Sequence, residues 1–148
     1  MRQEDIQHAI YDALVPLGWP VYDRVPQSAV CPYIVVGEQE SAPWDTDDST
    51  GSESILTVHV WSEYRGRLEA KRIQQAIYST LHRAELWVSF SAFVMIDCEF
   101  QETVTESDGL TTRGIQRFRI IVEDLPAAIL TSELGEELAT ESDTPLAA

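Results

Sequence analysis

The sequence predicts an α+β domain, with two helices packed on one face of a mixed, mainly antiparallel β-sheet of about four strands. Two observations carry this prediction. Apolar residues recur at helical spacing in two segments and at strand spacing in four others, in the order helix, two strands, helix, two strands. The chain of 148 residues, 44% of them hydrophobic, is also long enough for one domain whose core needs no metal or disulfide.

The first helix is expected from Glu4 to about Val15. Its apolar residues fall on one face, acidic residues occupy the first turn, where the helix dipole favours anions, and Pro16 and Gly18 end the pattern. The following segment, residues 18–32, contains three prolines and is predicted to cross the surface as extended coil.

Two strands are expected next, separated by an acidic loop. The continuous apolar run Tyr33–Val36 predicts a strand that is central or covered on both faces. The stretch Glu38–Glu53, which contains no Lys or Arg, predicts the loop. Alternation from Ser54 to Ser62 then predicts a strand with one face toward the core, and that face carries Leu56, Val58 and Val60.

A second helix is expected from Arg67 to Ala84. The connection through this helix is long enough to join two parallel strands by a right-handed crossover, which makes the sheet mixed. Both helices are expected to cover the same face of the sheet. The apolar stripe of the second helix consists of Ile73, Ala76, Ile77, Leu81 and Ala84.

A β-hairpin is predicted to close the domain. Alternating runs at residues 93–103 and 112–122 are joined by a turn around Asp108 and Gly109. The residues predicted to face the core are Val94, Ile96, Cys98 and Phe100 in the first run, and Phe118, Ile120 and Val122 in the second.

The register of this hairpin follows from parity. For both apolar sets to reach the same core, paired residue numbers must sum to an even value, because a one-residue slip turns every side chain to the other face. A sum near 216 places Asp97 opposite Arg119 and Glu99 opposite Arg117, which are favourable cross-strand pairs.

Composition changes after residue 122. The segment 123–148 carries seven acidic residues and no basic one, which is typical of a solvated tail. The sequence therefore predicts a folded domain over residues 1–122 and an acidic C-terminal extension over residues 123–148.

Charge and cysteine content disfavour several classes of function. Ten Lys and Arg against 25 Asp and Glu give a formal net charge of -15, so most of the surface would repel DNA. Two distant cysteines do not indicate a disulfide framework or a zinc site. The N-terminus lacks the apolar run of a signal peptide, and no apolar stretch approaches the ~20 residues of a spanning helix. We expect no membrane association, no secretion by that route and no cofactor.

An enzyme is the alternative class. His59 lies on one strand face with Trp61, and Asp97 with Glu99 could lie on a nearby strand, as in a site of a bacterial hydrolase or adaptor domain. The competing interpretation makes His59 and Trp61 a contact surface. The segment Asp45–Glu53 has the acidic density for a hard cation but not the ligand order of a calcium loop. We therefore expect no catalytic and no metal site.

Four sequence blocks carry a family resemblance. They are VYDRVP (21–26), PYIVVG (32–37), Trp44-Asp45 with LTVHVWS (56–62), and YRGRLEA followed by IYSTLHR. Each block alone is unspecific, but their order and spacing resemble the tail-terminator, or tail-completion, family of long-tailed bacteriophages and gene-transfer agents. The resemblance covers about residues 21–122, includes the first helix weakly and leaves out the C-terminal extension.

The resemblance implies a structural virion protein and not an enzyme. Family members form a ring, implied here to be a hexamer of identical copies, that caps the head-proximal end of the tail tube, stops its polymerisation and joins it to the head. The implied partners are copies of itself, the tail tube protein and the head-tail connector or stopper protein, while the genome passes through the ring without specific binding. Such a protein assembles in the host cytoplasm and ends in the tail or neck of the virion. Another neck or tail-tube component is the alternative within this class.

Segregated charges indicate where copies could meet. Cations cluster around the start of the second helix, where they oppose the helix dipole, and carboxylates crowd residues 38–53. A head-to-tail ring needs two unlike, complementary surfaces on each subunit, although both could be merely solvated faces. The loops at residues 44–53 and 105–112 are candidates for partner recognition at the ring faces. The candidate interface residues are Trp44, Asp45, Asp47, Asp48, Glu53, His59, Trp61, Arg65, Arg67, Lys71, Arg72, Asp108 and Arg113.

Overall fold

The computed structural model describes residues 3–125. Its elements are α1 (Gln3–Leu14), a 3-10 helix η1 (Val15–Leu17), β1 (Val21–Tyr22), β2 (Tyr33–Pro43), β3 (Gly51–Ser62), α2 (Leu68–Leu81), β4 (Ser91–Thr105) and β5 (Thr112–Asp124). The strands form one sheet in the order β1-β2-β3-β5-β4. β1 runs parallel to β2, and all other neighbouring strands are antiparallel. The α+β class and the mixed sheet are confirmed, with five strands instead of about four.

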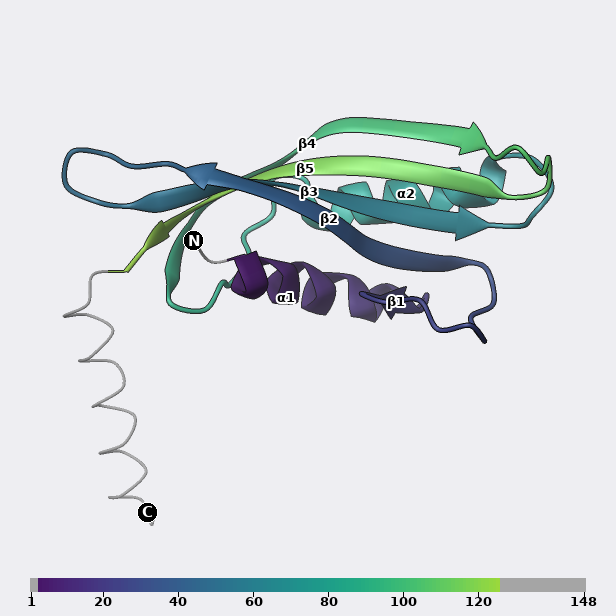
Figure 1. The fold of residues 1–148 in the computed structure, drawn as a ribbon, viewed down its shortest axis with the longest axis horizontal. Helices are drawn as coiled ribbons and strands as arrows, with labels where there is room; N and C mark the ends of the chain where they lie inside the picture. Colours follow the sequence, from purple (N-terminus) through teal and green to yellow (C-terminus); the bar gives the residue numbers. More distant parts are fainter. Residues whose placement is uncertain (1–2, 126–148) are drawn as a thin grey trace, which may run out of the picture.

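Both helices lie on the same face of the sheet, as predicted (Figure 1). α2 contacts β3, β4 and β5, and α1 contacts β2 and α2. Side chains of the two central strands alternate as the sequence predicts, and their helix-facing members are fully buried. The core includes Ile6, Ile10 and Leu14 of α1, Ile73, Ile77 and Leu81 of α2, Leu56, Val58 and Val60 of β3, and Phe118, Ile120 and Val122 of β5.

The segment 18–32, predicted as coil, contains one strand. β1 forms two pairs with β2, to Ile34 and Val35. Two residues are too few to produce a strand pattern in a sequence, which is why periodicity missed β1. Because it is so short, β1 covers only the beginning of β2.

The predicted acidic loop at residues 38–53 is wrong over most of its length. β2 and β3 extend toward each other and leave only residues 44–50 as a loop. Polar contacts hold the extended pair where the apolar core ends: the hydroxyl oxygens of Ser41 and Ser54 lie 2.7 Å apart, and Gln39 Nε2 donates to Ser54 Oγ at 3.2 Å. These two strands therefore project beyond the helices as a hairpin (Figure 1).

The predicted hairpin register is correct at its centre and changes at bulges. Asp97 lies opposite Arg119, as predicted. A β-bulge just before Phe100 then inserts one residue, so Phe100 and not Glu99 lies opposite Arg117. The prediction for Glu99 is wrong because parity holds only along an uninterrupted strand.

The same bulges redistribute the side chains of β4. Ile96 is 1% exposed, as expected for a core residue, and Cys98 packs partly buried against the core. Val94 and Phe100, predicted to face the core, are 42% and 39% exposed. Phe93 packs against the core instead, because a second bulge follows it.

Two elements end where the sequence did not predict. α2 begins after Arg67, which forms no side-chain cap hydrogen bond, and it ends at Leu81 instead of Ala84. β5 continues to Asp124, two residues into the predicted C-terminal extension. Residues 126–148 of that extension lie outside the described residues.

Candidate assembly interfaces

The loop of residues 44–50 holds most of the acidic interface candidates, at one end of the long axis (Figure 1). Asp45 Oδ1 accepts a hydrogen bond from Gly51 N–H at 3.3 Å, and Asp48 Oδ1 accepts one from the Thr46 hydroxyl at 3.2 Å. Among residues 3–125, neither these two aspartates nor the neighbouring Asp47 forms an ion pair. Their charges are therefore available to a partner.

Trp44 and Glu53 flank this loop and are engaged within the subunit. Trp44 N–H donates to the Gly51 carbonyl at 2.9 Å, which closes the hairpin. Glu53 accepts a hydrogen bond from Arg119 Nε on the face of the sheet that carries no helix. This hydrogen bond raises the pKa of Arg119. Glu53, one of the interface candidates, thus forms an ion pair within the subunit.

The basic candidates Arg65, Arg67, Lys71 and Arg72 lie at the opposite end, after β3. All four are exposed, and none forms an ion pair within residues 3–125. The length of β3 separates them from the acidic loop, so no carboxylate of that loop neutralises them in the same subunit (Figure 1).

Arg67 and Lys71 line a groove of about 420 Å³ between α2 and β4, which we call the basic groove. Its other lining residues are mostly amides and hydroxyls. The full set is Arg67, Lys71, Gln74, Gln75, Gln101, Glu102 and Thr103.

A buried amide network forms the floor of the basic groove. Gln74, only 4% exposed, donates to the Glu102 carbonyl at 3.0 Å and accepts from the Thr103 hydroxyl at 2.6 Å. Gln116 donates to the Gln74 carbonyl at 2.9 Å. Gly114 makes room, because a Cβ there would meet the Gln74 amide at 2.6 Å. This network was not predicted from the sequence, where its signal is a glutamine on the apolar face of the helix, next to Ile73.

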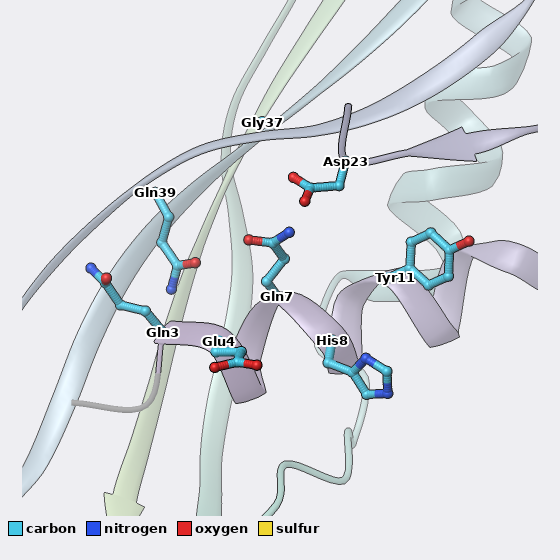
Figure 2. Close-up of a pocket in the computed structure, with 8 residues that line it drawn as sticks. All are labelled: Gln3, Glu4, Gln7, His8, Tyr11, Asp23, Gly37 and Gln39. Atoms are coloured by element: carbon cyan, nitrogen blue, oxygen red, sulfur yellow. The ribbon is translucent and has the colours of Figure 1, made fainter. Parts of the chain in front are cut away.

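A second groove, of about 660 Å³, lies between α1 and the outer edge of β2, and we call it the acidic groove. Figure 2 shows the α1 side chains on one side, with Asp23 after β1 and Gln39 of β2 facing them. No Lys or Arg lines it, and its carboxylates Glu4 and Asp23 form no ion pair within residues 3–125. It is lined by Gln3, Glu4, Gln7, His8, Tyr11, Asp23, Gly37 and Gln39. The acidic groove was not predicted from the sequence, because it depends on how α1 packs.

Of the alternative histidine and carboxylate site, His59 and Asp97 are not brought together. His59 lies level with Ile115, whereas Asp97 lies level with Arg119, four residues along β5. At about 3.4 Å per residue these rows are roughly 14 Å apart. Asp97 instead pairs with Arg83 at 3.5 Å.

His59 is hydrogen-bonded to a different carboxylate. Its Nε2 lies 3.0 Å from Glu38 Oε1, and this hydrogen bond lowers the pKa of Glu38. A Cβ at Gly37 would meet the His59 ring at 2.8 Å, so the glycine lets the imidazole lie over β2. His59 therefore links β3 to β2 on the helix-free face.

Trp61 and Arg113 form a contact on the same helix-free face. The Arg113 guanidinium lies over the Trp61 ring, 5.5 Å from its centroid, and its Nε lies 3.2 Å from Glu106 Oε2. Trp61 and Arg113, both interface candidates, therefore contact each other within the subunit.

Asp108 shapes the β4–β5 turn. Its carboxylate accepts hydrogen bonds from the N–H groups of Leu110 and Thr111 at 2.8 and 2.9 Å, and from the Thr111 hydroxyl at 2.7 Å. The bonds from Thr111 and Leu110 lower the pKa of Asp108.

Two features are absent from residues 3–125. These residues contain no group of three or more His, Cys, Asp or Glu side chains arranged to hold a metal ion. None of their helices is long and apolar enough to cross a membrane.

Comparison with known proteins decides the family. Residues 8–123 match the family model described as tail completion protein gp17. The chain belongs to this family. The tail completion protein gp17 of Bacillus phage SPP1 is 30% identical over 93 residues, which cover 63% of this chain and 69% of that relative. The family resemblance found in the sequence blocks is thereby confirmed, and a tail completion protein is a structural protein and not a class of enzyme.

A solved structure shares the fold. A chain in the virion of a native gene transfer agent particle superposes with a TM-score of 0.72 at 23% sequence identity, covering 80% of this chain and 94% of that one. This chain therefore shares its fold with a chain of that virion.

Proposed function

We propose that this tail completion protein is a tail terminator. It forms a ring, expected to be a hexamer, that caps the head-proximal end of the tail tube, stops tube polymerisation and docks onto the head connector. The observation that best supports this proposal is the pair of oppositely charged grooves at opposite edges of the sheet, with no internal partner for either charge within residues 3–125.

Two unlike surfaces on one subunit support head-to-tail association. When the basic groove of one copy meets the acidic groove of the next, each copy keeps its other groove free for a further copy, and a rotation that closes gives a ring. Complementary potentials also speed encounter and penalise wrong pairings. A subunit with net charge -15 needs such local pairing, because its copies otherwise repel one another.

The two ends of the long axis supply surfaces for other partners. The acidic loop at residues 44–50 and the turn at residues 106–111 lie at opposite ends of the sheet (Figure 1). We assign them to the two faces of the ring, one toward the tail tube protein and one toward the connector. Loops held by a rigid sheet are suited to recognition. The ring would assemble in the host cytoplasm and remain in the neck of the particle, with the genome passing through it.

A tail-tube or other neck component is the alternative, since a fold does not determine a position in an assembly. Electron microscopy of the purified protein separates the two proposals. A terminator gives single rings, whereas a tube protein stacks into long polymers. Long tubes formed by this chain alone would contradict the terminator proposal.

Charge reversal tests the interface directly. Arg67→Glu with Lys71→Glu should convert rings to monomers in light scattering, because the basic groove would then repel the acidic groove of its neighbour. The matched control is Arg24→Glu with Arg117→Glu, which changes the total charge equally, lies outside both grooves and breaks no ion pair within residues 3–125. Unchanged mass for the groove variant, or equal loss for the control, would count against this interface.

A further inference from the structure

The outer edge of β2 is covered only at its beginning. β1 pairs with β2 only at Ile34 and Val35, so residues 36–43 have no strand neighbour on that side within the described chain. The acidic groove lies beside this open part of β2, and Gly37 and Gln39 form part of its wall (Figure 2). An open edge presents unpaired backbone donors and acceptors, which is a template for another strand.

Two hydrogen bonds determine which backbone groups of β2 face outward. Ile34 N–H donates to the Pro20 carbonyl, just before β1, at 2.8 Å and therefore points away from β3. Trp44 N–H donates to the Gly51 carbonyl of β3 at 2.9 Å and therefore points toward β3. Because N–H groups alternate between the two sides of a strand, and the bulge after Val36 adds one residue, the N–H groups of Gln39 and Ser41 point outward.

The connection that follows α2 covers the outer edge of β4 over the first part of the strand. Arg83 N–H donates to the Ile96 carbonyl at 2.8 Å, and Cys98 N–H donates to His82 Nδ1 at 2.9 Å. Residues 100–105 have no strand neighbour on that side within the described chain. The same alternation, continued past the bulge, turns outward the N–H groups of Gln101, Thr103 and Thr105.

We propose that copies join edge to edge. The open part of β4 (residues 100–105) in one copy pairs antiparallel with the open part of β2 (residues 36–43) in the next, so that one sheet continues around the assembly. The pairing rests on the proposed ring and specifies how it is built. A second copy is the occupant because the charges beside the two edges are complementary, with Arg67 and Lys71 beside β4 and Glu4 and Asp23 beside β2. Strand pairing brings these two grooves together on the helix side.

The register follows from avoiding like charges. Glu40 and Glu102 both lie on the helix-free face, level with Ile55 and Ile115 respectively. Facing carboxylates destabilise a sheet. Placing Ser41 opposite Thr103 avoids them, because it sets Glu40 opposite Val104.

This register predicts how the strands incline. Thr103 lies level with Val60 of β3, through Gly114, whereas Ser41 lies level with Ser54. Pairing Ser41 with Thr103 therefore staggers successive copies by six residues along β3, about 20 Å. Four strands at about 4.8 Å separate equivalent points, about 19 Å. The strands then tilt by roughly 45°, within the 35–45° typical of closed barrels.

The sense of the tilt decides which face lines the channel. α2 connects the parallel strands β3 and β4, and such connections are right-handed. For a right-handed β3–α2–β4 connection, the stagger inclines the strands in a right-handed sense around the ring only if the helices lie outside the ring. Right-handed strand twist requires this incline in a closed sheet. The helix-free face, with Trp61 and Arg113, would then line the channel.

Disulfide cross-linking tests the pairing. In a background of Cys31→Ser and Cys98→Ala, the pair Glu40→Cys and Val104→Cys would face each other across the new junction, on the helix-free face. Residues at such a non-hydrogen-bonded position have Cβ atoms about 4.5 Å apart, close enough for a disulfide. The control pairs Glu40→Cys with Thr105→Cys, since Thr105 belongs to the same edge but faces the helix side.

Oxidation should convert the first variant into a ladder of covalent oligomers on a non-reducing denaturing gel and leave the control monomeric. In parallel, Ser41→Pro should abolish rings while Ser41→Ala retains them, because only proline removes the outward N–H. Intact rings without cross-linking and without an effect of the proline would overturn edge pairing and leave the terminator proposal standing. Failure of the wild-type chain to form rings would overturn both.

Discussion

The centre and the edges of the sheet differ in how strongly their sequences specify them. β3 pairs with β5 through twelve consecutive residues without an irregularity, and both strands bury a full row of side chains beneath the helices. β2 and β4, toward the edges, contain one and two bulges and are only partly covered on their outer sides. Packing against helices thus fixes a central strand, whereas an edge strand keeps freedom that association between copies can use.

The largest difference between centre and edge should appear when a phenylalanine is truncated. Phe118 of β5 is 0% exposed, and Phe118→Ala should lower the free energy of unfolding by about 3–5 kcal/mol. Phe100→Ala on β4, where the ring is 39% exposed, should cost about 1 kcal/mol or less. Denaturant unfolding measures both, and equal losses would contradict the contrast between centre and edge.

A second comparison lies within β4 itself. Ile96→Ala should cost about 2–5 kcal/mol, because its side chain is 1% exposed. Val94→Ala should cost under about 1 kcal/mol, because the bulge turns this side chain to solvent. If the two melting temperatures fall by the same amount, the bulge after Phe93 is absent in solution.

The amide floor of the basic groove should have an intermediate effect. Gln74→Ala removes the hydrogen bonds to the Glu102 carbonyl and the Thr103 hydroxyl, which should cost about 1–3 kcal/mol. Gln75→Ala, one residue along the helix and exposed, is the matched control and should stay within about 0.5 kcal/mol. Thermal melts of the monomeric protein distinguish them; an indifferent Gln74 variant would show that the network does not stabilise α2.

The smallest effect concerns acid. Hydrogen bonds lower the pKa of Asp108 and of Glu38, so both carboxylates stabilise the folded state above their unfolded pKa and lose this contribution as pH falls. Stability should therefore decline from about pH 5 downward. Asp108→Asn removes one of these two contributions and should make the decline shallower in urea unfolding. The change should be slight, because both carboxylates are exposed and solvent screens them. A steeper decline for the Asn variant would reverse the assigned sign.

The centre was predictable because one rule governs it. Alternation placed Leu56, Val58 and Val60 on the buried face, and parity placed Asp97 opposite Arg119. Helical spacing located both helices to within a few residues at either end. These patterns are visible in a sequence because each element must bury one face.

The edges were not predictable in the same way. β1 is too short to show a period, and a bulge before Phe100 has no signature in the alternating run. The extended part of β2 is held by Gln39 and Ser41, polar residues that composition alone assigns to a loop. The basic cluster was visible in the sequence but neither groove was, since a groove depends on the packing of a helix beside a strand.

The most direct test of head-to-tail complementarity mixes two variants that each reverse one groove. Glu4→Lys with Asp23→Lys makes the acidic groove basic, and Arg67→Glu with Lys71→Glu makes the basic groove acidic. Each variant alone sets like charges against each other at every junction and should sediment as a monomer in analytical ultracentrifugation. An equimolar mixture restores opposite charges at every junction and should sediment as rings of alternating copies. A mixture that stays monomeric, or either variant forming rings alone, would contradict the account.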